Sequence, residues 1–142
     1  MTSYIKRLDE EKLNLIIIKN RKDIFKSSKN GMIPLLEAIE NLGLPTLSNS
    51  IVIDKLVGKA AALIICFFKA REVQTKILSF NARDVLEKYK LKHSSEILIP
   101  KIMNRSGTDV CPFEKAVFNT KDPAEGYKQV IIEAKKLGIY PS

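Results

Sequence analysis

The chain has 142 residues, 45% of them hydrophobic and 28% charged, with a formal net charge of +8. These values fit one globular domain, and they exclude a disordered chain and a membrane protein. The longest apolar run, Ala60–Phe68, is far shorter than the ~20 residues that cross a bilayer. The charged start has no secretory signal, and the two distant cysteines give no disulfide framework. We therefore expect a cytoplasmic protein with reduced thiols and no membrane association.

The first quarter of the chain predicts a charged helix followed by a β-hairpin. Residues 1–12 are charged and compatible with a helix, and Leu13–Ile18 is rich in the β-branched residues typical of strands. Asn20-Arg21 predicts a tight turn, because Asn tolerates a positive φ. Lys22–Lys26 then predicts the antiparallel partner strand.

Two helices are predicted next. Apolar residues recur at helical spacing from Ile33 to Leu42, until Gly43 ends the pattern. Leu44–Asn49 is a short connector. Ser50–Phe68 is apolar almost all round, so we predict one long buried helix over this range.

The second half predicts alternating strands and helices. Alternation over Val73–Leu78 predicts a strand, Asn81–Tyr89 a helix and Ile97–Ile99 a second, parallel strand. Two closing helices are predicted over Cys111–Phe118 and Pro123–Leu137. The expected fold is α/β: one domain over residues 1–142, whose core at 13–118 holds a mixed sheet flanked by helices on both faces.

Three stretches together resemble a known family. They are Asp54-Lys55-Leu56-Val57-Gly58-Lys59-Ala60-Ala61-Ala62, Ile102-Met103-Asn104-Arg105-Ser106-Gly107-Thr108 and Cys111-Pro112-Phe113-Glu114. They are similar to an uncharacterised bacterial and archaeal family of unknown function whose members adopt a cytidine-deaminase-like fold. The resemblance implies a fold and brings no established activity.

The residues of a zinc deaminase are missing. Such an enzyme needs H-x-E at the start of one helix and P-C-x-x-C at the start of the next. Here those sites should fall near Gly58-Lys59-Ala60 and Ser79–Arg83, and neither contains a ligand. His93, Cys66 and Cys111 lie on unrelated segments without ligand spacing. We therefore exclude zinc-dependent deamination and expect neither a metal nor a cofactor.

The isolated histidine and the first cysteine favour structural interpretations. Cys66 lies inside the apolar segment, where a cysteine is usually a small hydrophobic residue. His93 lies in Lys92–Ser95, which predicts a polar turn with an exposed, inert histidine.

Cys111 admits two interpretations. Pro112 suits the first position of a helix and Glu114 the third, which makes Cys111 the N-cap. A thiol there feels the positive end of the helix dipole and is activated by it, with Arg105 and Lys115 nearby in sequence. Alternatively, Cys111 is only a cap residue.

Two polar segments are candidate binding sites. Backbone amides, a guanidinium and hydroxyls in the loop 104–108 suit a phosphate or carboxylate. The small-residue start of the apolar helix, around Gly58, would admit a ligand. An equally good interpretation is that the loop is a solvated turn and that the small residues at the helix start only allow close packing. The candidate ligand-binding residues are Asp54, Lys55, Gly58, Lys59, Asn104, Arg105, Gly107, Thr108 and Glu114.

The sequence leaves three functions open. The leading hypothesis is a protein that binds a small anionic or nucleotide-like ligand, with Lys59 and Arg105 as counter-charges and Cys111 as nucleophile or redox sensor. The second is a module that binds protein or, less well supported, nucleic acid through its basic surface, because the pI is near 9.5. The third is thiol chemistry at Cys111. Whether a reaction is catalysed, and whether the chain forms a homo-oligomer, stay open.

Overall fold

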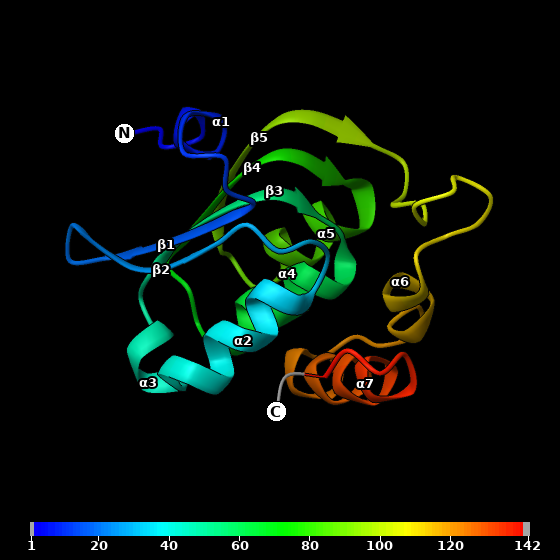
Figure 1. Ribbon diagram of the computed structural model, residues 1–142. Helices are drawn as coiled ribbons and strands as arrows, with labels where there is room; N and C mark the ends of the chain where they lie inside the picture. The colour runs from blue at the N-terminus through cyan, green and yellow to red at the C-terminus, as the bar shows by residue number, and fades with distance from the viewer. Residues whose placement is uncertain (1, 141–142) are drawn as a thin grey trace.

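The computed structural model of the protein describes residues 2–140, and a five-stranded mixed sheet lies at its centre (Figure 1). The strand order is β2-β1-β3-β4-β5. The strands, in chain order, are β1 (Leu15–Lys19), β2 (Lys22–Ser27), β3 (Ile51–Val57), β4 (Glu72–Ser79) and β5 (Lys92–Ile99). β1 pairs antiparallel with β2 and β3, whereas β3, β4 and β5 run parallel.

The predicted hairpin is confirmed. β1 and β2 are joined by Asn20 and Arg21, whose φ angles are 52° and 66°. Two consecutive residues with positive φ form a type I′ turn. The twist of this turn matches the twist of the two strands that it joins. β1 is buried because it lies between β2 and β3.

Helices cover the two faces of the sheet unequally (Figure 1). The short α1 (Lys6–Glu10) covers one face with a small apolar cluster that includes Leu8. There the buried Gln74 side chain accepts a hydrogen bond from the Tyr4 N–H at 2.7 Å and donates one to the Thr2 carbonyl at 2.8 Å. The other helices belong to the opposite side, and they are α2 (Ile33–Leu42), α3 (Leu44–Leu47), α4 (Lys59–Phe67), α5 (Phe80–Lys88), α6 (Pro112–Ala116) and α7 (Pro123–Lys136).

α4 is the central helix of the larger core. It packs against α5, α6 and α7 as well as β3. Close approach to α7 depends on Gly126, where a Cβ atom would lie 2.8 Å from the Leu63 side chain. Leu63, Ile64 and Ile65 are fully buried in consequence, as expected for a helix that is apolar on all sides.

The prediction of one helix over Ser50–Phe68 is wrong. The first part is β3, Gly58 ends it, and only Lys59–Phe67 is helical. β3 lies in the middle of the sheet, and its first three residues, Ile51, Val52 and Ile53, are buried, so this part of the strand lacks the polar alternation that identifies a half-exposed strand. Its β-branched start, Ile51-Val52-Ile53, is the one local signal of a strand.

The edge strand β5 corrects a second prediction. β5 pairs with β4 along its whole length, so Lys92–Ser95 is part of a strand and not the predicted turn. His93 is therefore a half-buried strand residue and not an exposed one. Its Nδ1 lies 3.0 Å from the Leu91 carbonyl oxygen. Nothing covers the outer side of β5 among residues 2–140, and Ile97 and Leu98 are 57% and 44% exposed.

The closing helices α6 and α7 confirm the prediction for the end of the chain. α7 ends one residue before the predicted Leu137, which caps it. α6 is shorter than Cys111–Phe118, and Cys111 is its N-cap as predicted.

Candidate functional site

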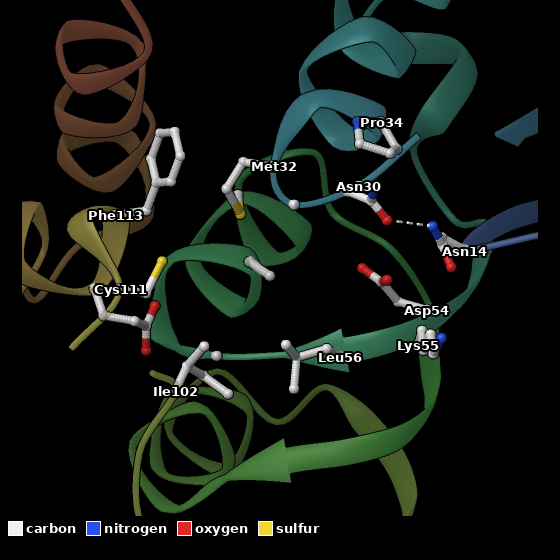
Figure 2. A pocket seen from close by; sticks show the side chains of 14 residues that line it. Asn14, Asn30, Met32, Pro34, Asp54, Lys55, Leu56, Ile102, Cys111 and Phe113 are labelled. Carbon is white, nitrogen blue, oxygen red and sulfur yellow. Dashed lines mark hydrogen bonds between the residues drawn. The ribbon is translucent and has the colours of Figure 1, made fainter. Parts of the chain in front are cut away.

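A cavity of about 200 Å³ lies where β3 ends and α4 begins (Figure 2). Segments far apart in the chain line it: the start of β1, the loop before α2, the end of β3, and the segment from Ile102 to α6. Polar side chains gather at its two ends, and the wall between them is apolar. The apolar lining consists of Met32, Pro34, Leu56, Ala61, Ile102 and Phe113.

Asp54 defines one end of this cavity. It lies on β3, and its carboxyl group points into the cavity in Figure 2. Burial raises the pKa of Asp54 to about 7, although the backbone N–H groups of Leu56 and Lys55 oppose the rise. Asp54 forms no salt bridge within residues 2–140. The carboxyl group is therefore present in both protonation states near neutral pH.

Two asparagines stand beside Asp54. Asn14 Nδ2 donates to Asn30 Oδ1 at 3.0 Å and to the carbonyl oxygens of Ser28 and Lys29, also at 3.0 Å. These bonds fix the loop before α2 against the start of β1. Asn14 Oδ1 and Asn30 Nδ2 remain without a hydrogen-bond partner in the described part of the chain, so an acceptor oxygen and an NH2 group with two donors are left for a ligand.

Glu114 defines the other end. Its Oε1 accepts the Lys59 backbone N–H at 2.9 Å and its Oε2 accepts that of Ala60 at 2.8 Å. The N-cap of α4 is Gly58, which has no side chain, so a residue of α6 caps α4 in its place. Burial raises the pKa of Glu114, and the two N–H groups oppose the rise.

Gly58 is required by this contact and not by its backbone angles. Its φ is −98°, which any residue can adopt. A Cβ atom there would lie 2.6 Å from Glu114 Oε1 and 2.7 Å from Ile102 Cγ1. A side chain at position 58 would therefore require Glu114 or Ile102 to shift away from the start of α4.

Cys111 also lines the cavity (Figure 2). As the N-cap of α6 it is half-buried, and its side chain makes no capping hydrogen bond. Cys66 differs, because it packs against the larger core and burial raises its pKa to about 11. Its thiol is therefore protonated at neutral pH, in line with the packing role predicted from the sequence.

The structure brings together only some of the predicted site residues. Asp54, Lys55, Gly58, Cys111 and Glu114 line the cavity, with Lys55 exposed at its rim. The loop residues do not line it. Those outside are Asn104, Arg105, Gly107 and Thr108.

The loop from Met103 to Val110 is closed on itself. Met103 and Val110 form an isolated bridge, and Asn104 Oδ1 accepts the Thr108 N–H at 3.1 Å. Gly107 has a φ of 71°, which the turn requires. The groups expected to orient a ligand therefore hold the loop's own shape.

Lys59 also lies outside the cavity. Its Nζ donates to the Phe118 carbonyl at 2.9 Å, on the other side of the start of α4. Its predicted role as a counter-charge in the cavity around Gly58 therefore has no support in this arrangement.

No pattern in the sequence indicates that Asn14, Asn30 or the apolar wall belongs to the site. Their side chains meet only through strand pairing and through the packing of α2 and α6. Asn and Gly, as in Asn30-Gly31, are typical of a loop, but this preference does not reveal which surface the loop faces.

The two expected deaminase positions do begin helices. Gly58-Lys59-Ala60 starts α4 after β3, and Ser79 caps α5 after β4 by accepting the Ala82 N–H at 3.1 Å. These positions offer a lysine, small residues and a capping serine, which are not zinc ligands. Within residues 2–140, no three His, Cys, Asp or Glu side chains are grouped so that they could hold a metal ion.

Comparison with known proteins identifies the family. The family model for a domain of unknown function, DUF1893, matches residues 3–133. The chain belongs to the DUF1893 family. A crystal structure of a DUF1893 family protein from Thermotoga maritima is similar to this DUF1893 chain, with 32% identity and a TM-score of 0.80. The match covers 92% of this chain and 85% of that one.

No curated protein matches the sequence of this DUF1893 chain at a significant level. In the described residues, no helix combines the length and apolar character needed to span a bilayer.

Proposed function

We propose that the DUF1893 chain binds a small molecule in the cavity between Asp54 and Glu114. The observation that carries the proposal is the Asp54 carboxyl group, which is half-buried, forms no salt bridge within residues 2–140 and points into a cavity with apolar walls. A concave apolar pocket with a few convergent polar groups and a perturbed carboxyl is the usual form of a binding site.

The lining narrows the class of ligand. Two carboxyl groups and two amides line the cavity, and the only lysine or arginine among its lining residues is the exposed Lys55. A phosphate deep inside would meet unfavourable charge. A carboxyl with a pKa of about 7 suits a nitrogen heterocycle, because it accepts from an amino group and, when protonated, donates to a ring nitrogen. The predicted nucleotide-like ligand thus enters base first, with any phosphate outside near Lys55.

The volume fits one such ring. A cavity of ~150 Å³ holds benzene, and the cavity here measures about 200 Å³. A nucleobase with one or two substituents therefore fills it, whereas a whole nucleotide does not.

A thermal-shift panel of nucleobases and nucleosides tests the proposal. A ligand at 100 times its Kd stabilises by about 2.7 kcal/mol, which raises the Tm by several degrees. Asp54→Ala should abolish the rise for the best ligand, because it removes both the acceptor and the donor that the carboxyl group offers. Lys22→Gln, an exposed change on the hairpin, should preserve it. A panel without any Asp54-dependent shift would reject this function.

We also propose that the sheet is of the cytidine-deaminase-like type that the sequence resembles. The parallel neighbours β3 and β4, each followed at once by a helix, support this proposal. Superposition of an experimental structure on zinc deaminases tests it: β3, α4, β4 and α5 should overlay in the same order, with no metal ligands at positions 58–60 and 79–83.

Thiol chemistry at Cys111 is the second candidate, because its half-buried thiol faces the same cavity. The pH dependence of Cys111 alkylation, measured in Cys66→Ala protein, tests it. An apparent pKa well below the ordinary ~8.5 supports an activated thiol, and an ordinary value removes the case.

Both cysteines are free in the described structure, which supports the proposed cytoplasmic location.

A further inference from the structure

A second hollow lies on the opposite side of the start of α4. It measures about 330 Å³ and lies between α5 and the segment that joins α6 to α7. Lys59, Lys88 and Lys121 line it from three different elements. The only carboxylate in the lining is the exposed Asp84.

The three lysines lack acidic partners. Lys59 Nζ donates to the Phe118 carbonyl at 2.9 Å, and Lys88 Nζ donates to the Lys121 carbonyl at 3.5 Å. None of the three forms a salt bridge within residues 2–140. The pKa of Lys59 is lowered, first by burial and then, against the opposing Glu114, by the charges of Lys121 and Lys88. Three like charges that repel one another around one hollow form a site that an anion would stabilise.

An exposed aromatic ring borders the same hollow. Phe118 is 71% exposed, more than any other large apolar side chain in the described structure. An exposed ring beside cations is the arrangement on which nucleobases stack while the phosphate is held by charge. The Asn81 side chain, also in the lining, offers a donor and an acceptor.

We propose that this lysine hollow binds a free mononucleotide, with its phosphate among Lys59, Lys88 and Lys121 and its base against Phe118. The lysines converge on one hollow and do not form a track, which suits a single phosphate group better than a nucleic-acid strand. The site is separate from the Asp54 cavity and does not depend on the function proposed there.

Equilibrium binding of AMP and UMP, measured by titration calorimetry, tests the proposal. Each of Lys88→Gln and Lys121→Gln should weaken binding about tenfold, because each removes one charge-assisted hydrogen bond. Lys22→Gln removes the same charge from the hairpin and should leave the Kd unchanged. Asp54→Ala, which removes the hydrogen-bonding groups of the Asp54 cavity, should also leave the Kd unchanged, and this distinguishes the two sites.

Ligand fragments separate the two parts of the site. Phe118→Ala should weaken AMP binding while leaving the weaker binding of inorganic phosphate unaltered, and adenosine should bind far more weakly than AMP. Absence of AMP and UMP binding at millimolar concentration, or equal loss with Lys22→Gln, would overturn the proposal. If oligo(dT) binds much more tightly than UMP, with a steep salt dependence, the partner is a single strand and the assignment to a free mononucleotide is wrong.

Discussion

The two hollows that flank the start of α4 are opposite in chemistry. The cavity on one side presents the carboxyl groups of Asp54 and Glu114, and the hollow on the other presents three lysines. Gly58 and Lys59 are adjacent in the chain, yet Gly58 lines the first and Lys59 the second. Neighbours at a helix start point in different directions, so adjacency in sequence does not make two residues members of one site. The proposed ligands differ accordingly: a nitrogen heterocycle for the Asp54 cavity and a mononucleotide for the lysine hollow.

Gly58, in the wall of the Asp54 cavity, is the position where a substitution should lower stability most. Gly58→Ala should lower the free energy of unfolding by about 3 kcal/mol, because the new Cβ collides with Glu114 and Ile102. Urea denaturation measures it. Gly107→Ala is the control: its Cβ meets nothing within 4 Å, and its positive φ costs only about 1 kcal/mol. Equal losses in the two variants would mean that the close contact at Gly58 is relieved at little cost.

Removal of the Glu114 carboxylate should have the next largest effect. Glu114→Ala leaves the Lys59 and Ala60 N–H groups at the start of α4 without their acceptor, which costs about 2 kcal/mol. Glu114→Gln keeps one acceptor oxygen and should lose about half as much. Hydrogen exchange of the Lys59 and Ala60 amides should accelerate in the Ala variant. Unchanged exchange there would show that Glu114 does not cap α4.

Asp54 should reduce stability above neutral pH. Because its folded pKa of about 7 exceeds the ordinary 3.8, the folded protein binds this proton more tightly than the unfolded chain. The contribution of Asp54 to the free energy of unfolding is fully present below pH ~4, and it is lost as the pH rises to about 7. Asp54→Asn should therefore match wild type at pH 4 and exceed it by on the order of 2 kcal/mol at pH 8.

Asp84, which is exposed in the lysine hollow, provides the matched control for the Asp54→Asn experiment. Asp84→Asn should change the free energy of unfolding by less than about 0.5 kcal/mol at either pH. A constant difference between Asp54→Asn and wild type from pH 4 to pH 8 would contradict the burial of the Asp54 charge.

Repulsion in the lysine hollow predicts the smallest effect. Lys121→Gln removes one of three like charges and should raise the free energy of unfolding by about 0.3 kcal/mol at low salt. The gain should disappear in 1 M salt, where charges are screened within ~3 Å. Thermal melts at the two salt concentrations measure it. A loss of stability at low salt would instead mean that the Lys121 side chain stabilises the fold.

Local chemistry explains which elements were predictable. The left-handed pair Asn20-Arg21 and the starts of α6 and α7 follow from the preferences of Asn and Pro within a few residues. β3 was not predictable, because its buried, apolar first half has the same composition as a buried helix.

The candidate site was predictable only in part for a different reason. Asp54, Gly58, Cys111 and Glu114 were proposed from unusual local sequence, and they do line one cavity. The hydrogen bond between Glu114 and Lys59 spans 55 positions, and no local pattern indicates such a contact. The loop at 104–108 looked suited to a ligand because the same polar groups serve turns and anion sites alike.

The uncovered edge of β5 affects how the protein behaves when it is concentrated. Its outer row of backbone N–H and C=O groups has no partner strand in the described structure, and Ile97 and Leu98 make the last part of that edge apolar. Such an edge is a template for intermolecular pairing and aggregation. The charged residues Lys92 and Glu96 discourage such pairing only before Ile97. A charged residue in place of Ile97 is therefore the change best suited to prevent aggregation at high protein concentration.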